Sequence, residues 1–575
     1  MGLDDLKICE KRQALLDSSR HLLVLGGPGC GKTTIALVKA ATILSSETIR
    51  SSQKVLFLSF ARATIARVLE DVKRRVPEPQ HRQLEISTYH GFEWAIIQSF
   101  GYLITGHKRL RLLSPPEESS RMAGVPTANR RGKLQELLKT EQLLGFDLFP
   151  DLAAEILERS PRLRRIISDC YPTIFVDEFQ DTNRDEWRLI KSLAEQSTVI
   201  ALADPDQRIY EFRGADAARI GEFTEAVNPE VFDFANENNR SSGTDIPAFG
   251  NDLLTRTNKG KTYKDVKIIK YRYYGTEPFL PIKFAILDSI KRLVEAGNPN
   301  WSLGVLVSSN DFMLKVSNHL ESSSSRAKEI FHEVLIDPDG PSLAAMLIGG
   351  LLESASTTGE IEKQLLHDLI QHLRGCGGGD ISQADLKLVA ALEEYSKTGQ
   401  IRGRTRLQLI ADTQAIAAGR LQLTMTGDPM KDWIQIRDLI SAARHEALRA
   451  VADHGRYVRL LRRGTQLREG LTEQWKVHHS YKGAREIVSA ALTQEHFTAS
   501  TRTWKGVNLM TMHKSKGKEF DEVIIFEGYR NGRLLRDYAS ANDEAQARNT
   551  LRVAVTRARL RTMILTPSGN SCPML

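Results

Sequence analysis

The stretch that decides the fold is LLVLGGPGCGKTT, Leu22 to Thr34. Four apolar residues predict a buried strand, and KTTIALVKAATIL after the glycines predicts a helix. Gly26, Gly31, Lys32 and Thr33 satisfy G-x-x-x-x-G-K-[ST], a spacing that lets backbone N–H groups and a helix N-terminus surround phosphate oxygens. A chance glycine loop is the alternative, and the flanking strand and helix disfavour it. We therefore expect a phosphate site in which Lys32 reaches the β- and γ-phosphates and the Thr33 hydroxyl holds Mg²⁺.

The stretch TIFVDEFQDTN, Thr173 to Asn183, supplies the acids that such a site needs. Its β-branched and aromatic start predicts a central strand of a parallel sheet. Asp177 at the strand end suits the metal, and Glu178 suits the activation of an attacking water. Alone, the stretch fits a solvated acidic turn equally well. With the phosphate loop earlier in the chain, that interpretation becomes the minor one.

The wider pattern predicts a multidomain α/β protein. Strand-like runs alternate with helical ones near the start and again near the end, as parallel sheets require, whereas the middle of the chain is mainly helical. A length of 575 residues exceeds one ordinary core. A hydrophobic content of 41% without an apolar run of about 18 residues predicts a soluble protein with no membrane association.

The cysteine and charge counts narrow the environment of the protein. Five scattered cysteines without a CxxC pair argue against a disulfide framework and a zinc site, and they favour the reducing cytoplasm. The net charge of +8 is compatible with simple solubility and with a polyanionic partner.

Seven segments of the chain resemble the conserved motifs of a known protein family. DEFQD resembles motif II of the UvrD/Rep-like superfamily 1 helicases, and other segments match in the order of that family. They are FLSFARA (57–63, motif Ia), STYHGF (87–92, motif Ib), ADPDQRIYEFRGA (203–215, motif III), NNRSS (238–242, motif IV), VNLMTMHKSKGKEFDEVII (507–525, motif V) and LRVAVTRAR (551–559, motif VI). The resemblance runs from the phosphate loop almost to the C-terminus.

The resemblance implies two RecA-like P-loop NTPase domains with parallel sheets, each with a mainly helical insertion. The expected boundaries are 1–91 and 166–235 for the first domain, 92–165 for its insertion, 236–336 and 491–575 for the second domain, and 337–490 for its insertion.

The resemblance also assigns roles around the nucleotide. It implies that Gln207 senses the γ-phosphate, that Arg240 and Arg557 are arginine fingers, and that Glu519 is a ribose-side acid beside a tightly approaching Gly517. The full set of expected catalytic residues is Lys32, Asp177, Glu178, Gln207, Arg240 and Arg557, with Thr33 and Asp177 on Mg²⁺. Expected ATP contacts are Gln13, Gly26, Gly27, Pro28, Gly29, Cys30, Gly31, Lys32, Thr33, Thr34, Arg240, Gly517, Glu519 and Arg557.

Three departures from the family pattern concern the base of the nucleotide. Asn239 stands where the family has a tyrosine that stacks on adenine, and Thr34 replaces a basic residue. Gln13, the best match to the glutamine that reads adenine, lies closer to the phosphate loop than expected. Base specificity is therefore left open.

A second set of matched residues is expected to bind single-stranded DNA, because aromatic rings stack on bases of any sequence. An ordinary core aromatic is the alternative for each ring. The expected contacts are Phe60, Thr88, His90, Tyr210, Phe212, Arg213 and His513.

The resemblance thus implies an ATP-dependent DNA helicase or translocase that moves 3′ to 5′ on single-stranded or tailed duplex DNA. Two alternatives stay open at this point. One is a DNA-stimulated NTPase that does not unwind. The other is a sensor or accessory subunit that accompanies a nuclease partner in an anti-phage system of the Gabija kind.

Overall fold

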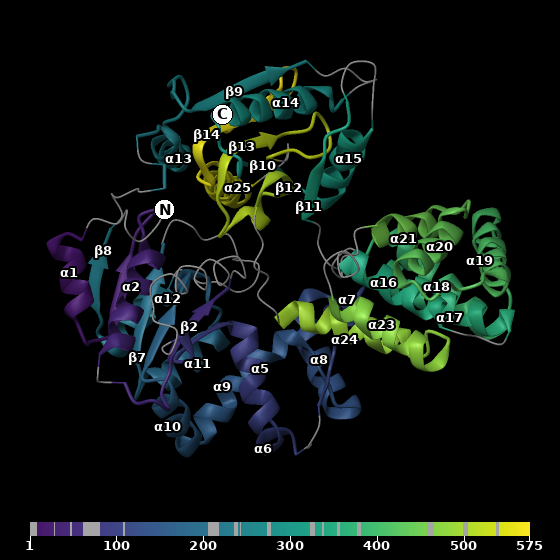
Figure 1. Cartoon of the computed structure of the whole chain (residues 1–575), viewed down its shortest axis with the longest axis horizontal. Helices are drawn as coiled ribbons and strands as arrows, with labels where there is room; N and C mark the ends of the chain where they lie inside the picture. Colours follow the sequence, from purple (N-terminus) through teal and green to yellow (C-terminus); the bar gives the residue numbers. More distant parts are fainter. Residues whose placement is uncertain are drawn as a thin grey trace. The chain divides into compact units, whose positions relative to one another are not determined.

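A computed structural model gives the architecture of the chain (Figure 1). It describes residues 8–27, 29–46, 49–60, 81–106, 110–204, 218–234, 240–241, 243–272, 278–322, 328–335, 339–353, 357–376, 381–456, 465–497, 504–535 and 540–575.

The first sheet has six parallel strands in the order β3-β2-β6-β7-β1-β8. The strands are β1 Leu22–Leu25, β2 Val55–Ser59, β3 Leu84–Thr88, β6 Thr173–Val176, β7 Thr198–Ala203 and β8 Glu230–Asp233. The predicted strands at Leu22 and Thr173 are confirmed, and every residue of β6 is buried, as a central strand covered on both faces requires.

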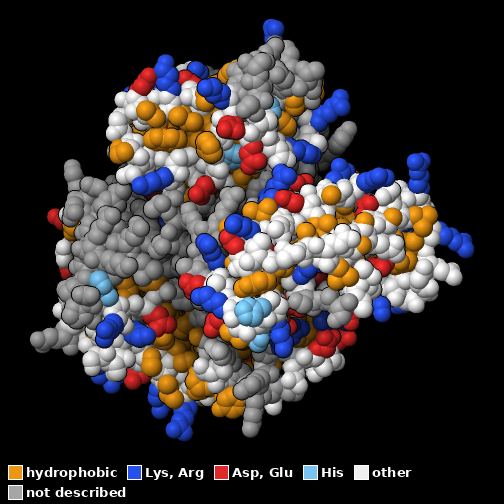
Figure 2. All heavy atoms as spheres, turned by 45° about the vertical axis from the view of Figure 1, so that its right-hand side comes forward, with side chains coloured by type: hydrophobic (Ala, Val, Ile, Leu, Met, Phe, Trp, Pro, Cys, Tyr) orange, Lys and Arg blue, Asp and Glu red, His pale blue; other side chains and the backbone are white. Residues whose placement is uncertain are grey.

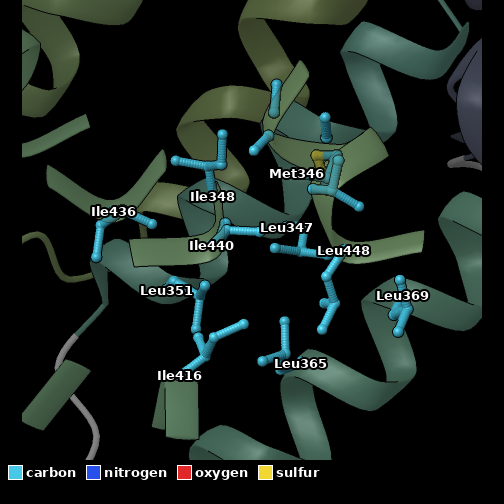
Figure 3. Close-up of a cluster of buried hydrophobic side chains, with 14 of the residues drawn as sticks. Met346, Leu347, Ile348, Leu351, Leu365, Leu369, Ile416, Ile436, Ile440 and Leu448 are labelled. Atoms are coloured by element: carbon cyan, nitrogen blue, oxygen red, sulfur yellow. The ribbon is translucent and has the colours of Figure 1, made fainter. Parts of the chain in front are cut away.

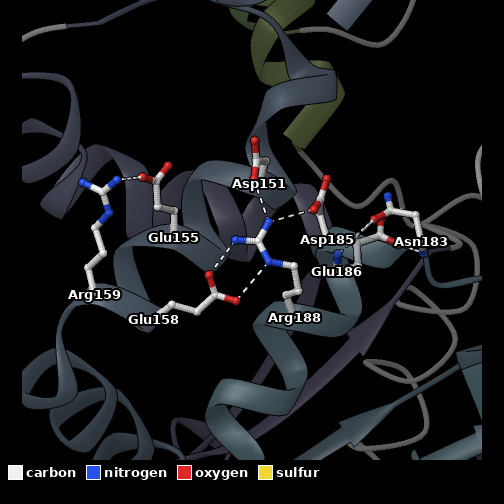
Figure 4. Close-up of polar contacts among 8 residues, drawn as sticks. All are labelled: Asp151, Glu155, Glu158, Arg159, Asn183, Asp185, Glu186 and Arg188. Carbon is white, nitrogen blue, oxygen red and sulfur yellow. Dashed lines mark hydrogen bonds and ion pairs between the residues drawn. The ribbon is translucent and has the colours of Figure 1, made fainter. Parts of the chain in front are cut away.

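Helices flank the strands of this sheet in the sequence, and we call the sheet with its helices the first lobe. They are α1 Glu10–Asp17, α2 Lys32–Ser45, α5 Tyr89–Phe100, α9 Phe149–Arg159, α10 Pro161–Cys170, α11 Arg184–Ala194 and α12 Arg219–Val227. Arg188 of α11 fixes this helix to α9 by donating to Asp151, Glu158 and Asp185 at 2.5–2.9 Å (Figure 4). Helix α11, which follows the acidic turn after β6, is therefore firmly attached to the rest of the first lobe.

The second sheet also has six parallel strands, in the order β11-β12-β10-β13-β14-β9. They are β9 Val266–Tyr271, β10 Ser302–Val307, β11 His332–Leu335, β12 Gly506–Thr511, β13 Phe520–Phe526 and β14 Ala558–Pro567. With α13 Ile246–Thr255, α14 Leu280–Glu295, α15 Asn310–Glu321, the 3₁₀ turn η5 His513–Ser515 and α25 Ala541–Val555, they form the second lobe. The predicted α/β class with two parallel sheets is confirmed.

The chain divides into two compact units. The first holds both lobes and comprises residues 1–100, 150–335 and 499–575; the second is helical and comprises residues 101–149 and 336–498. The helical unit thus takes chain from both predicted insertions, whereas α5, α9 and α10 belong to the unit with the sheets.

The helical unit is built around one apolar core. Its helices are α6 Tyr102–Thr105, α7 Pro115–Met122, α8 Thr127–Glu141, α16 Asp339–Leu352, α17 Thr358–Gly375, α18 Gln383–Thr398, α19 Arg404–Gln422, α20 Pro429–Ser441, α21 Glu446–Arg456, α23 Thr465–His478 and α24 Ala484–Phe497, with short strands β4 Arg111–Leu112 and β5 Leu143–Leu144. Leu347 of α16, Leu365 of α17, Ile416 of α19 and Leu448 of α21 point into one cluster (Figure 3). In the described part of the chain, no helix is both long and apolar enough to cross a membrane.

Candidate active site

The phosphate loop lies between β1 and α2, at the carboxyl edge of the first sheet. Gly29 and Gly31 have φ angles of 80° and 94°, which side chains disfavour, and Gly31 precedes the first residue of α2. Helix α2 therefore directs the N–H groups of its first turn, with Thr33 among them, toward the loop. Pro28 lies outside the described residues.

Lys32 sits inside this loop. Its ammonium donates to the carbonyl oxygens of Gly26 and, at 3.2 Å, of Gly27. Burial alone would lower the pKa of Lys32, but Cys30, Asp204, Glu178 and Asp177 raise it above the ordinary value. Lys32 is thus held as a cation beside the acids of motif II, as a phosphate-binding lysine should be.

Asp177 and Glu178 follow β6 at the same edge of the sheet. The backbone N–H of Asp177 donates to Leu58 at 2.9 Å, and the Ser59 hydroxyl donates to its carboxylate at 3.3 Å. Burial and the charge of Glu178 raise the pKa of Asp177 to about 7. A buried carboxylate that faces a second one is a site for which a hard divalent cation supplies the missing positive charge, so Asp177 with the Thr33 hydroxyl fits Mg²⁺.

Glu178 has an unusual backbone and a dedicated hydrogen-bond partner. Its φ of 53° lies in the left-handed region, and the Gln180 amide donates to its carboxylate at 2.6 Å. The amide oxygen of Gln180 accepts from the backbone N–H of Asp204 at 3.0 Å. Buried Gln180 therefore links the expected base to the end of β7, where motif III begins. The sequence places Gln180 within DEFQD but does not identify its hydrogen-bond partners.

Lys516 of motif V, in the second lobe, reaches the acids of motif II in the first. Its ammonium contacts the Asp181 carboxylate and lies 3.9 Å from a Glu178 oxygen. Lys516 and Asp181 are both buried. Burial raises the pKa of Glu178. The opposite effect comes from Lys516, Lys32, Gln180 and Arg557, and together they bring this pKa below its ordinary value. Lys514, Lys516 and Lys518 make motif V more basic than is usual in the family, but this pattern does not identify the partners of Lys516.

The two expected arginine fingers and Glu519 lie together. Arg240 donates to Glu519 at 2.8 Å and to the Thr556 carbonyl at 3.2 Å, and Arg559 donates to the other oxygen of Glu519 at 3.1 Å. Arg557 is 2% exposed and donates to the Val553 carbonyl at 2.9 Å.

The charges around Arg557 connect this group to motif II. Burial and the charge of Arg240 lower the pKa of Arg557 to about 9, whereas Glu178, Glu519 and Asp204 raise it. Arg557 thus lies within electrostatic reach of Glu178 from the opposite lobe. Gly517 has a φ of 75°, which permits the turn between Lys516 and Glu519.

Gln13, which is expected to contact adenine, lies near the start of α1. Gln13 is exposed, and its amide donates to Asp17 at 2.9 Å. Buried Arg12 lies closer to the phosphate loop, donates to the Cys30 carbonyl at 3.4 Å, and lies 5.3 Å over the Phe234 ring. Thr34 is buried in α2. The contact of Gln13 with adenine therefore remains a prediction, and the hydrogen bond of Gln13 to Asp17 does not favour it.

The expected DNA-contact residues are described only in part. Phe60 stacks on Tyr89, with ring centroids 4.3 Å apart and planes inclined by 17°. The Thr88 hydroxyl accepts a hydrogen bond from the Gly91 N–H at 3.0 Å. This bond fixes the start of α5, the helix that contains His90. His513 begins the 3₁₀ turn η5 after β12. Gln207, Tyr210, Phe212, Arg213 and Asn239 lie outside the described residues.

The distribution of charged side chains on the surface does not locate the DNA interface. On the face drawn in Figure 2, described Lys and Arg side chains are interspersed with Asp and Glu. Such a mixed surface is typical of a soluble protein. Charge alone therefore does not locate a nucleic-acid interface on this face, and its assignment rests on the motif residues.

The chain resembles known families over most of its length. Residues 9–129 and 126–228 match the UvrD/REP helicase N-terminal domain, and residues 288–568 match the UvrD-like helicase C-terminal domain. The ATP-dependent DNA helicase UvrD1 of Mycobacterium leprae is 22% identical over 673 residues, which cover 96% of this chain and 81% of the relative. The ATP-dependent DNA helicase PcrA of Bacillus subtilis is 23% identical over 638 residues, which cover 95% and 81%. The names of these relatives support neither a nuclease partner nor an anti-phage role.

Proposed function

Because the chain belongs to the UvrD/Rep-like family of superfamily 1 helicases, we propose that it hydrolyses ATP between its two lobes and thereby moves along single-stranded DNA. The direction is 3′ to 5′, and the movement displaces the complementary strand of a tailed duplex. The observation that carries the proposal is the position of Lys516 and Arg557, which bring charge from the second lobe to Glu178 of the first. A site completed by two lobes converts hydrolysis into relative movement of the lobes.

The residues of the first lobe bind the nucleotide and prepare the water. The loop N–H groups and Lys32 bind phosphate oxygens, and Thr33 and Asp177 would hold Mg²⁺, which neutralises phosphate charge when bound. Glu178 accepts the proton of the attacking water. Gln180 keeps the Glu178 carboxylate oriented through its 2.6 Å hydrogen bond.

The residues of the second lobe stabilise the charge that develops on the transferred phosphoryl group. Arg240 and Arg557 present planar guanidinium groups, which suit charge spread over several oxygens. In the structure Arg240 is held by Glu519 and Thr556. Arg240 therefore reaches the phosphate by exchanging its carboxylate partner for phosphate oxygens.

The DNA side rests on fewer described residues. Phe60 follows β2, Thr88 ends β3 and His90 follows β3, all at the carboxyl edge of the first sheet. His513 follows β12 of the second sheet. A DNA strand that contacts both sets of residues is shifted when the lobes move relative to each other. This arrangement supports a translocating motor rather than a static nucleotide-binding protein.

The test is ATP hydrolysis and strand displacement measured with single-stranded DNA and with duplexes that carry a 3′ or a 5′ tail. We expect hydrolysis to be stimulated by single-stranded DNA and displacement to require the 3′ tail. Glu178→Gln should bind nucleotide but lose hydrolysis, whereas Glu225→Gln, at an exposed position of α12, should behave like the wild type. Hydrolysis at the wild-type rate in Glu178→Gln would refute the assignment of the base. Stimulated hydrolysis without displacement would restrict the protein to translocation.

A further inference from the structure

Glu519 is shared by two arginines of the second lobe, and each arginine binds a different oxygen of its carboxylate. Nε of Arg240 donates to Oε1 at 2.8 Å, and Nη2 of Arg559 donates to Oε2 at 3.1 Å. The side chains of Glu519 and Arg240 are 10% and 15% exposed, against 42% for Arg559. Charge-assisted hydrogen bonds are the stronger kind, so Glu519 holds Arg240 firmly in this structure.

The second sheet fixes two of these three charges. Glu519 directly precedes β13, and Arg559 is the second residue of β14. The two strands are neighbours in the sheet, with Phe520 opposite Ala558. Glu519 and Arg559 thus belong to one edge of the sheet, whereas Arg240 comes from the segment of chain that precedes α13.

Arg559 has a second acidic neighbour, Asp521 of β13. The guanidinium of Arg559 lies 3.8 Å from one oxygen of Asp521. The other oxygen of Asp521 accepts hydrogen bonds from the backbone N–H and the hydroxyl of Ser302, at 2.8 and 2.9 Å. Ser302 begins β10, the strand on the other side of β13. Asp521 is therefore fixed by the sheet, and it helps to keep Arg559 beside Glu519.

Arg240 has a partner that it can exchange. Its Nη1 donates to the Thr556 carbonyl at 3.2 Å, and its Nε is bound to Glu519. A phosphate group offers acceptor oxygens of the same kind as a carboxylate, so the two compete for the N–H groups of one guanidinium. When Arg240 moves to a phosphate, Arg559 remains on the other oxygen of Glu519. The carboxylate therefore keeps a cation, which avoids the large cost of a buried charge that has lost its partner.

We propose that Glu519 competes with the γ-phosphate for Arg240, and that Arg559 is a positioning residue that permits this exchange by retaining Glu519. The inference rests on the proposed function, since it assumes that Arg240 contacts the transferred phosphoryl group. A nucleoside diphosphate lacks the γ-phosphate and leaves Arg240 on Glu519, whereas a triphosphate draws Arg240 away. When the phosphate departs after hydrolysis, Glu519 takes Arg240 back.

The test is the ratio of the Kd for ADP to the Kd for the non-hydrolysable ATP analogue AMP-PNP, measured by titration calorimetry with Mg²⁺. The nucleoside holds both ligands in the same register, so the ratio reports the γ-phosphate and cancels any contact of Glu519 with the ribose. Glu519→Gln keeps the shape of the side chain and removes its charge. Because Arg240 is then released, we expect the ratio to rise about fivefold or more. Simple damage to the site would not strengthen the binding of the triphosphate.

Arg559→Met should shift the ratio in the opposite direction. Without Arg559, the charge of Glu519 depends on Arg240, so Arg240 is harder to withdraw and the ratio should fall about threefold or more. Arg561→Met is the matched control, because Arg561 lies two residues farther along β14 and is also partly buried; its ratio should equal that of the wild type. In a Glu519→Gln background, Arg559→Met should leave the ratio unchanged, because the carboxylate through which Arg559 acts is gone.

The inference would be overturned, and the proposed function left intact, by any of three results. They are a ratio that does not rise in Glu519→Gln, a ratio that falls equally in Arg559→Met and Arg561→Met, and an effect of Arg559→Met that persists in the Glu519→Gln background. The last result would mean that Arg559 binds the phosphate itself. A wild type that does not hydrolyse ATP would overturn both the inference and the proposed function.

Discussion

Lys516 and Asp181 form a buried contact between the two lobes, although 335 positions separate them in the sequence. The same ammonium lies 3.9 Å from Glu178, so one cation serves two acids of motif II. A buried charge needs its partner, and Asp181 loses its cation if the second lobe moves away. Under the proposed mechanism, this contact makes the hydrolytic site depend on lobe closure.

Replacing Lys516 tests this dependence. Lys516→Met leaves Asp181 and Glu178 without their shared cation, and breaking a buried pair in this way costs about 3–5 kcal/mol. We expect kcat for ATP hydrolysis to fall by at least about tenfold, since the closed arrangement loses this stabilisation. Steady-state hydrolysis measures the effect. Exposed Lys505, one residue before β12, provides the control: Lys505→Met should retain the wild-type rate, and equal losses in both variants would contradict the role of the contact.

The raised pKa of Asp177 predicts a pH-dependent metal affinity. Burial and Glu178 bring this pKa to about 7, so that metal must displace a proton at lower pH. Titration calorimetry with Mg²⁺ and ADP should give an affinity about tenfold weaker at pH 6 than at pH 8, as expected for one proton with a pKa near 7. Asp177→Asn should abolish most of the binding and its pH dependence. An affinity that is flat between pH 6 and pH 8 would exclude the proposed titration.

The same shift has a consequence for stability in the absence of metal. The folded-state pKa of Asp177 lies above the value of 3.8 that is ordinary for aspartate, so the folded protein holds a proton that the unfolded chain has released. The contribution of Asp177 is therefore most favourable below about pH 4 and is lost as the pH rises through about 7. Urea unfolding with chelator present measures this effect. The free energy of unfolding of the wild type should fall relative to that of Asp177→Asn as the pH rises from 5 to 8.

Gln180 should affect turnover more than nucleotide binding. Gln180→Ala removes the amide that joins Glu178 to the end of β7 but leaves the phosphate loop untouched. We expect kcat to fall by about tenfold or more with little change in KM for ATP, as for other groups that orient a catalytic residue. Exposed Gln196 supplies the control substitution, Gln196→Ala. A change confined to KM would show that Gln180 serves binding instead.

Arg188 should stabilise the lobe. It contacts three carboxylates, whereas Arg159 in the same view contacts Glu155 alone (Figure 4). The Arg188 side chain is 30% exposed, against 67% for Arg159. We therefore expect Arg188→Met to lower the free energy of unfolding by about 1–2 kcal/mol and Arg159→Met by less than about 0.5 kcal/mol, measured by urea denaturation. Similar values for the two variants would mean that the network adds nothing beyond a surface pair.

Much of the fold followed from local sequence signals. The strands at Leu22 and Thr173 were predictable because buried strands of parallel sheets are continuous apolar runs, and the phosphate loop has a spacing that its chemistry dictates. The order of the motifs then predicted the second sheet. These features are encoded within a few residues of where they act.

The remainder depends on contacts that the spacing of residues does not encode. Periodicity predicts helices in residues 101–149 and 336–498 but does not say that they cluster in one unit. Lys516 contacts the acidic turn of the other lobe, and Gln180 joins that turn to the residue after β7. Arg12 rather than Gln13 faces the phosphate loop because of the rotation of α1 about its own axis. A helix that starts one residue earlier or later presents a different side chain.

The left-handed backbone at Glu178 has an evolutionary cost. A residue with a side chain at φ 53° is strained, and glycine or asparagine would adopt this conformation more readily. If Glu178 is the base, as we propose, natural replacements that stabilise the protein at this position also abolish ATP hydrolysis. Stability and turnover are opposed at a single residue, and a population selected only for heat resistance should lose this carboxylate early.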